Sequence, residues 1–207
     1  MAHKRVLLIR HGQTPGNEEK RYIGRKSDEA LSELGQSLAK KAAKALGETP
    51  GFNKDGFKIY ASPLKRATET AGILFGENRI ITPIEELTEI DFGDFEGLNY
   101  NDLKENRDYQ LWIDSGGKMA FPNGEDRDEF IERSFRGFFK AIENDLEKEV
   151  AIVCHGGNIM SILSRITGKD YFDFMTPNLG GYILEFELEN ERISEFTLHS
   201  FDLGSDS

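Results

Sequence analysis

The sequence predicts an α/β protein with a mostly parallel sheet, flanked by helices and closed by a C-terminal hairpin. Short apolar runs alternate with helical stretches through most of the chain, which is the pattern of strand–helix–strand units. The last two apolar segments follow one another with no helix between them, as in a hairpin. No internal repeat, low-complexity tract or linker divides the chain. We therefore expect one domain over residues 1–207.

The strands are predicted by short apolar, branched runs such as Val6–Ile9, which have the composition of buried strands. The helices are predicted by apolar residues at helical spacing and by starting signals. Ser32 is a suitable N-cap, and the pair Ser62-Pro63 is typical of a first helical turn. Strands are predicted at residues 57–61, 79–82, 150–154, 182–188 and 192–199, with helices at 33–46, 62–75, 126–148 and 158–167, a loop at 12–24 and a turn at Asn190.

Residues 83–125 form the longest stretch without clear periodicity, with short helices expected near 101–107 and 109–115. A connection of this length is usually functional. We predict a lid or substrate-specificity segment here.

Composition and charge limit the function classes. Hydrophobic residues make up 38% and charged residues 30%, which fits a folded core. The single cysteine, Cys154, excludes an intrachain disulfide and favours a reducing compartment, and it lies in an apolar strand as core packing. The first apolar run is too short for a signal peptide, and no run is long enough to span a membrane. We expect a cytoplasmic protein.

The net charge of −11 disfavours nucleic acid and anionic membranes as partners. A phosphate ester would need a local cluster of positive groups. Three strand ends supply one: Arg10-His11-Gly12 follows the first strand, Arg66 begins the helix after the second, and His155-Gly156-Gly157 follows the strand at 150–154.

The carboxyl ends of parallel strands meet at one edge of a sheet, so these side chains are expected to converge there. Two helix N-termini would point at the same place and favour an anion. Each residue alone has an ordinary structural explanation, such as a hydrogen-bonding histidine or a solvated arginine. Their recurrence at three strand ends favours a phosphate pocket.

These residues belong to longer motifs that resemble the histidine phosphatase superfamily, which includes the phosphoglycerate mutase-like proteins. The resemblance covers the chain except residues 98–125 and the last hairpin. The matching segments are Leu8-Ile9-Arg10-His11-Gly12-Gln13-Thr14 with Asn17, Arg21-Tyr22-Ile23-Gly24, Leu31-Ser32-Glu33-Leu34-Gly35, residues 61–70, Leu87-Thr88-Glu89 with Phe92-Gly93 and Glu96-Gly97, and residues 154–157.

The resemblance implies that His11 attacks phosphorus and forms a phosphohistidine, with Glu89 as the acid and base. Residues alone do not single out Glu89 among 37 acidic residues. Guanidinium groups of Arg10 and Arg66 suit the phosphate oxygens, and His155 would add a hydrogen bond or a charge. Asn17 and the backbone of Gly12 and Gly156 would complete the phosphate site. No closely spaced histidine pair or Gly-x-x-x-x-Gly-Lys loop occurs, so we expect no metal ion and no cofactor.

Three functions stay open: a phosphatase of small phosphomonoesters, a cofactor-dependent phosphoglycerate mutase, and a non-catalytic binder of phosphorylated ligands. Glu89 is followed by Ile90-Asp91-Phe92 and not by the basic residues expected of a mutase. This favours the phosphatase branch, which includes α-ribazole phosphatases and broad-specificity phosphatases. The partner is then a small phosphate ester, and a homodimer is possible. Candidate substrate contacts are Arg21, Tyr22 and Gly24 at the rim, and Phe95, Trp112, Lys118 and Phe121 in the lid, where the aromatic residues have core packing as the alternative.

Overall fold

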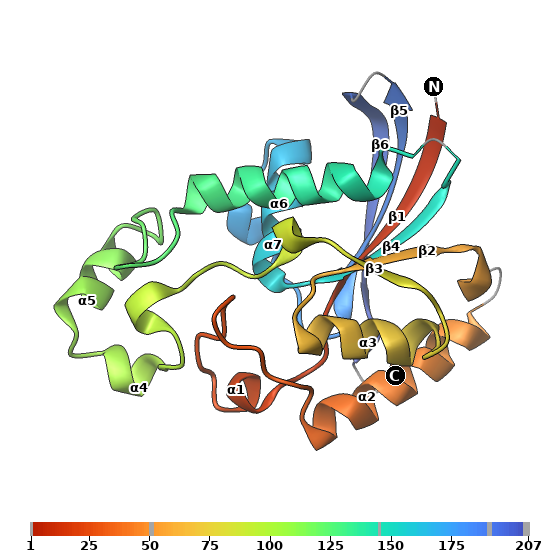
Figure 1. The fold of residues 1–207 in the computed structure, drawn as a ribbon. Helices are drawn as coiled ribbons and strands as arrows, with labels where there is room; N and C mark the ends of the chain where they lie inside the picture. The colour runs from red at the N-terminus through yellow and green to blue at the C-terminus, as the bar shows by residue number, and fades with distance from the viewer. Residues whose placement is uncertain (1, 50–51, 145, 190–191, 205–207) are drawn as a thin grey trace.

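The protein is described by a computed structural model, which covers residues 2–49, 52–144, 146–189 and 192–204 (Figure 1). A six-stranded sheet has the order β3-β2-β4-β1-β5-β6. The first four strands in that order are parallel, and β5 and β6 run antiparallel, as the sequence predicts. The strands are β1 (Ala2–Arg10), β2 (Lys58–Ala61), β3 (Ile81–Pro83), β4 (Glu149–Cys154), β5 (Gly180–Glu189) and β6 (Arg192–Asp202).

Helices cover both faces of the sheet. The helices are α1 (Pro15–Glu18), α2 (Glu33–Glu48), α3 (Lys65–Phe75), α4 (Tyr100–Leu103), α5 (Arg107–Asp114), α6 (Arg127–Ile142) and α7 (Gly156–Thr167), with short 3₁₀ turns η1 (Lys54–Gly56), η2 (Glu85–Leu87), η3 (Gly93–Phe95) and η4 (Tyr171–Phe174). Alternate residues of β1 face opposite sides, because side chains of a strand alternate. Val6 and Leu8 pack with α6 and α7, while Leu7 and Ile9 pack with α2 and α3.

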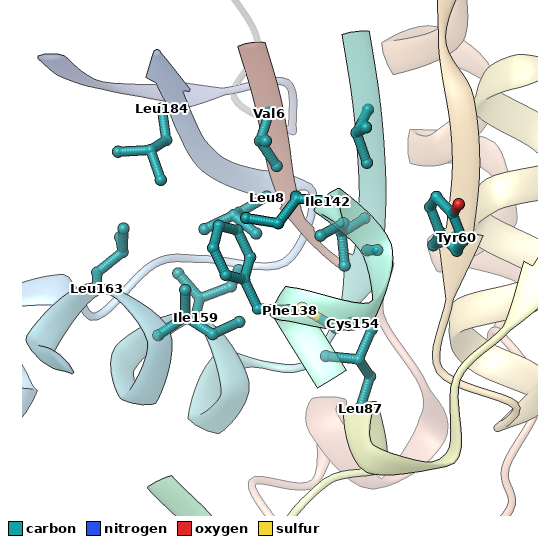
Figure 2. Packing of buried hydrophobic residues seen from close by; sticks show 14 of the residues in the cluster. Val6, Leu8, Tyr60, Leu87, Phe138, Ile142, Cys154, Ile159, Leu163 and Leu184 are labelled. Atoms are coloured by element: carbon teal, nitrogen blue, oxygen red, sulfur yellow. The ribbon is translucent and has the colours of Figure 1, made fainter. Parts of the chain in front are cut away.

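Figure 2 shows the core beneath α6 and α7, where Phe138 and Ile142 of α6 meet Ile159 and Leu163 of α7. Cys154 lies fully buried in this cluster, which confirms the prediction that it packs in the core. Burial raises the pKa of its thiol, so it stays protonated near neutral pH.

Several element boundaries differ from the predictions. The helix predicted over 126–148 ends at Ile142, and Leu146 is exposed. The predicted loop at 12–24 contains α1, because Thr14 caps it and Pro15 occupies its first turn. The helix expected to open at Ser62 begins at Lys65, because the Ser62 hydroxyl binds elsewhere. The predicted turn at Asn190 lies outside the described residues.

The segment 83–125 contains η2, η3, α4 and α5, which lie away from the sheet in Figure 1. It has a small apolar core of its own, made by Ile90, Phe95, Leu103, Tyr109, Phe121 and Phe130. Over the described part of the chain, no helix combines the length and the apolar composition needed to cross a membrane.

Candidate active site

The strand ends that carry the motif residues do converge. β1 and β2 both pair with β4 in parallel, so the residues that follow these three strands lie at one edge of the sheet. His11 and His155 meet there with ring centroids 5.0 Å apart. Both imidazoles are buried, as is the Arg66 guanidinium.

The structure fixes the protonation of the His11 ring. Its Nδ1 lies 2.7 Å from the Gly12 carbonyl oxygen, which can only accept a hydrogen bond. Nδ1 therefore carries the proton, and Nε2 keeps its lone pair. Burial, followed by the charges of Arg66 and Arg10, holds the pKa of His11 well below 6.5. His11 is therefore a neutral imidazole at neutral pH, with Nε2 as a nucleophile.

The two arginines differ in how they are held. Arg10 donates from Nη1 to the Thr176 carbonyl (2.7 Å), and its buried Nε has no partner within the described chain. Arg10 therefore has donor capacity left for an anion.

Arg66 is fully buried, and its guanidinium donates to the protein. Nη1 binds the Ser27 carbonyl (2.7 Å), Nη2 binds the carbonyls of Gly24 (3.0 Å) and Ile23 (3.4 Å), and Nε binds His155. Arg66 thus ties the loop at 23–27 to the site and supplies a buried positive charge. Direct contact of Arg66 with a phosphate stays a prediction.

His155 links Arg66 to the second strand. Its Nδ1 accepts from Arg66 Nε (3.2 Å), so Nε2 holds the ring proton and donates to the Ser62 hydroxyl (2.8 Å). Burial and the nearby charge of Arg66 lower the pKa of His155 well below 6.5. The ring is therefore neutral, and the structure gives it the hydrogen-bonding role of the two that the sequence left open, while its contact with a phosphate stays a prediction.

Glu89 lies at the same edge, after β3, and is 8% exposed. Its carboxylate accepts from the backbone N–H groups of Ile90 (2.9 Å) and Gly157 (3.4 Å). Burial is the largest influence and raises the pKa of Glu89 above its usual value, against the lowering effect of these hydrogen bonds and of Arg66. A carboxyl group with a raised pKa is suited to donating a proton.

Gly157 is required beside Glu89. A Cβ at this position would lie 2.4 Å from Glu89 Oε1 and 2.8 Å from a ring carbon of Phe130. The glycine at the start of α7 therefore lets the carboxylate approach the helix N-terminus.

Sequence reasoning missed Arg133 of α6, which holds the segment that carries Glu89. Its guanidinium donates to the carbonyls of Glu86 (2.9 Å), Thr88 (3.0 Å) and Glu89 (3.3 Å). It also pairs with both oxygens of Glu125 at 2.8 Å, and Glu125 accepts from the Asp91 N–H. The signal was absent because an arginine inside an amphipathic helix has the composition of a solvated face.

Three further predicted residues have partners in the protein. The Gly12 N–H donates to Thr70 Oγ1 (3.0 Å), and its carbonyl orients His11. The Asn17 side-chain oxygen accepts from the Thr14 N–H and from Asn178 Nδ2. Gly156 begins α7, and a Cβ there would lie 3.5 Å from Arg10 Nε, so its backbone stands beside Arg10.

A cavity of about 300 Å³ adjoins Arg10 and Glu89. Of the predicted rim residues, Tyr22 lines it. Arg21 does not, because its guanidinium binds Glu19, Asp102 and the Gly97 carbonyl. Gly24 is packed against Ile90 and Glu96 and serves as an acceptor for Arg66.

The lid candidates are placed in three ways. Trp112 and Phe121 line the cavity, Phe95 is buried beneath them, and Lys118 lines a neighbouring depression. Trp112 also packs against the apolar core of the lid, so both interpretations of its aromatic ring hold.

Among the described residues, no group of three or more His, Cys, Asp or Glu side chains is arranged to hold a metal ion. The fold and the site define an α/β protein with a neutral histidine, two arginines and a buried carboxyl group converging at the carboxyl edge of a parallel sheet.

The chain belongs to the histidine phosphatase superfamily (branch 1), whose sequence profile matches residues 6–198. It is 30% identical to the "Uncharacterized phosphatase PhoE" of Bacillus subtilis over 201 residues, covering 94% of this chain and 95% of that protein. A mycobacterial glucosyl-3-phosphoglycerate phosphatase structure matches with a TM-score of 0.75 and 25% identity, covering 97% and 99% of the two chains. The α-ribazole phosphatase of Shigella flexneri shares the fold, with a TM-score of 0.75, 24% identity and coverage of 92% and 93%.

Proposed function

We propose that this chain hydrolyses small phosphomonoesters through a phosphohistidine intermediate on His11. The observation that carries the proposal is the state of His11, which is buried, neutral and oriented by the Gly12 carbonyl beside two arginines. Membership of the histidine phosphatase superfamily and the phosphatase names of the relatives support the same reaction.

In the first step, the lone pair of His11 Nε2 attacks phosphorus, and the bond to the ester oxygen breaks. The protonated carboxyl of Glu89 gives its proton to the leaving alkoxide. The ring keeps its Nδ1 proton, so the phosphorylated imidazole is cationic and its N–H still donates to the Gly12 carbonyl. Arg10, with its unpartnered Nε, stabilises the charge on the transferring group, and the buried charge of Arg66 adds to this effect.

In the second step, the Glu89 carboxylate takes a proton from water, and the water oxygen attacks phosphorus. The bond from Nε2 to phosphorus breaks, inorganic phosphate leaves, and His11 and Glu89 return to their starting states. One carboxyl group thus serves as acid and then as base. The segment 83–125 acts as a lid that selects the organic part of the ester.

The choice of partner and location follows from charge and cysteine content. The net charge of −11 supports a small phosphate ester as partner rather than nucleic acid or a membrane surface. The single buried cysteine supports a reducing, cytoplasmic location.

The test is phosphate release from a panel of phosphomonoesters by the wild-type chain and by His11→Ala. We expect turnover in the wild type and none in the variant, because the nucleophile is removed. His199→Ala is the matched control, since His199 is exposed on β6. Appreciable turnover by His11→Ala contradicts the proposal.

The same panel includes 3-phosphoglycerate, with and without 2,3-bisphosphoglycerate. Isomerisation that depends on the bisphosphate would show a mutase instead. A stable adduct on His11 without phosphate release would show a binder.

A further inference from the structure

The cavity beside the site is lined mainly by aromatic side chains. Tyr22, Phe92, Trp112 and Phe121 form one wall, and Tyr171 and Phe172 of η4 form another. Tyr22 packs edge-on against Phe92 with centroids 5.1 Å apart, and Trp112 lies 5.0 Å from Phe121. Walls of this kind favour a planar aromatic group, because rings gain edge and stacking contacts beyond simple burial.

Arg127 stands in this aromatic wall without a counterion. Among the described residues no carboxylate pairs with it; its guanidinium carbon lies 5.8 Å from the Tyr171 ring centroid, and its buried Nε lacks a hydrogen-bond partner. The carboxylate next to it in sequence, Asp126, is engaged in capping α6. An unpaired arginine in a chain with 37 acidic residues is a free binding group for an anion.

Arg127 also faces a second depression that is basic. It shares this depression with Lys118, Arg165 and Lys169. Tyr171 connects Arg127 with the catalytic end, because its hydroxyl donates to the Gly157 carbonyl (3.4 Å) beside Glu89. Arg10 and Arg127 are thus two separate cationic positions on one aromatic cavity. Trp112 adds a second buried N–H without an acceptor.

We propose that the preferred substrate is an aromatic phosphomonoester that carries a second anionic group, and that Arg127 binds this group while the ring fills the cavity. The proposal rests on the proposed phosphatase function. A carboxylate and a second phosphate share the chemistry that Arg127 recognises.

Three substrates test it: 4-(carboxymethyl)phenyl phosphate has the ring and a carboxylate, 4-ethylphenyl phosphate has the ring alone, and 3-phosphoglycerate has a carboxylate without a ring. We expect the highest kcat/KM for the first. Arg127→Met should raise its KM by about 10- to 100-fold, the usual size of one hydrogen-bonded charge contact. It should change kcat/KM for 4-ethylphenyl phosphate by less than about threefold, since single surface contacts contribute little. Arg127→Lys should retain most of the preference. A bisphosphorylated arene, compared under the same variants, distinguishes a second phosphate from a carboxylate.

Arg136→Met is the matched control, because Arg136 is exposed on the same helix and does not line the cavity. Equal losses for both aromatic substrates in Arg127→Met, or a wild-type preference for 3-phosphoglycerate, would overturn the proposal. If no phosphomonoester is hydrolysed, the proposed function fails separately. Calorimetric binding of the two aromatic phosphates to the wild type and Arg127→Met then still decides the role of Arg127.

Discussion

At the scale of single residues, burial gives His11 and Glu89 opposite pKa shifts that suit opposite roles. Burial disfavours the charged form of each group, so it lowers the pKa of the imidazole and raises that of the carboxyl. The nucleophile must be deprotonated and the acid must be protonated. The same desolvated pocket therefore prepares both groups for reaction.

The pH dependence of kcat/KM follows from these directions. Activity should fall on the acid side at a pH below 6.5, where His11 takes up a proton and loses its lone pair. It should fall on the alkaline side as pH rises through the raised pKa of Glu89, because the carboxylate has no proton to donate. A profile with its acid limb at or above pH 6.5 contradicts the state assigned to His11.

Glu89→Gln should lower kcat by about 10²- to 10⁴-fold and remove the alkaline limb, because the amide cannot exchange a proton. The loss should be larger for alkyl phosphates than for 4-nitrophenyl phosphate, whose leaving group needs no proton. Steady-state kinetics with both substrates measure this. An equal loss for the two leaving groups would assign the proton transfer to another residue.

Gly157→Ala should disturb the site by displacing one carboxylate. The added Cβ would lie 2.4 Å from Glu89 Oε1, and Phe130 blocks the other side. A misplaced acid of this kind costs up to about 10²-fold in kcat. The control is Gly72→Ala in α3, where an added Cβ meets nothing within 4 Å. Wild-type kcat in Gly157→Ala would show that Glu89 does not act from its position beside α7.

At the scale of elements, α6 does more than cover the sheet. Arg133, at its middle, donates to three carbonyls of residues 86–89 and pairs with Glu125 just before the helix. The pair is largely shielded, with 13% and 12% of the two side chains exposed. α6 therefore fixes the segment that ends in Glu89, and Arg133 is a positioning residue.

Arg133→Lys keeps the charge but loses the forked contacts. We expect kcat to fall by about tenfold with KM nearly unchanged, since a small misplacement of a catalytic group is costly. The leaving-group dependence should move towards that of Glu89→Gln. Arg136→Met, exposed on the same helix, should behave as the wild type. A lower Tm with unchanged kcat for the folded protein would reduce Arg133 to a purely structural role.

The sequence predicted the elements that local signals determine. Apolar runs located all six strands, and the Ser32 cap located the start of α2, where Ser32 Oγ accepts from the Gly35 N–H. Ser62 was misassigned as a cap because its real partner, His155, is 93 residues away in the chain. Local patterns contain no information about such a partner.

The same limit applies to the site. His11, Arg10 and His155 could be placed because each follows a strand, and parallel strands bring their carboxyl ends together. Glu89 was found only through the family motif. Arg127 and Arg133 were missed, because their significance depends on what packs against α6 in three dimensions.

At the scale of the whole molecule, an acidic protein surrounds a basic pocket. The chain has 37 acidic and 26 basic residues, and repulsion among the excess carboxylates opposes compaction. Salt screens this repulsion at the surface but screens buried charges less. Arg10 and Arg66, whose pKa values are lowered by burial, remain an attractive site for an anion.

Salt and phosphate should therefore stabilise the protein by separate routes. Raising NaCl should increase Tm modestly in every variant, because it screens the net charge of −11. At equal ionic strength, phosphate at tenfold its dissociation constant should add about 1.4 kcal/mol, since it binds only the folded state. For a chain of this size that is about 3–6 °C in Tm. Arg10→Met should keep the NaCl effect and lose most of the phosphate increment, because Arg10 Nε is the buried donor left without a protein partner in the pocket. Thermal melts in matched NaCl and phosphate buffers measure both effects, and an unchanged phosphate increment in Arg10→Met would place the anion site elsewhere.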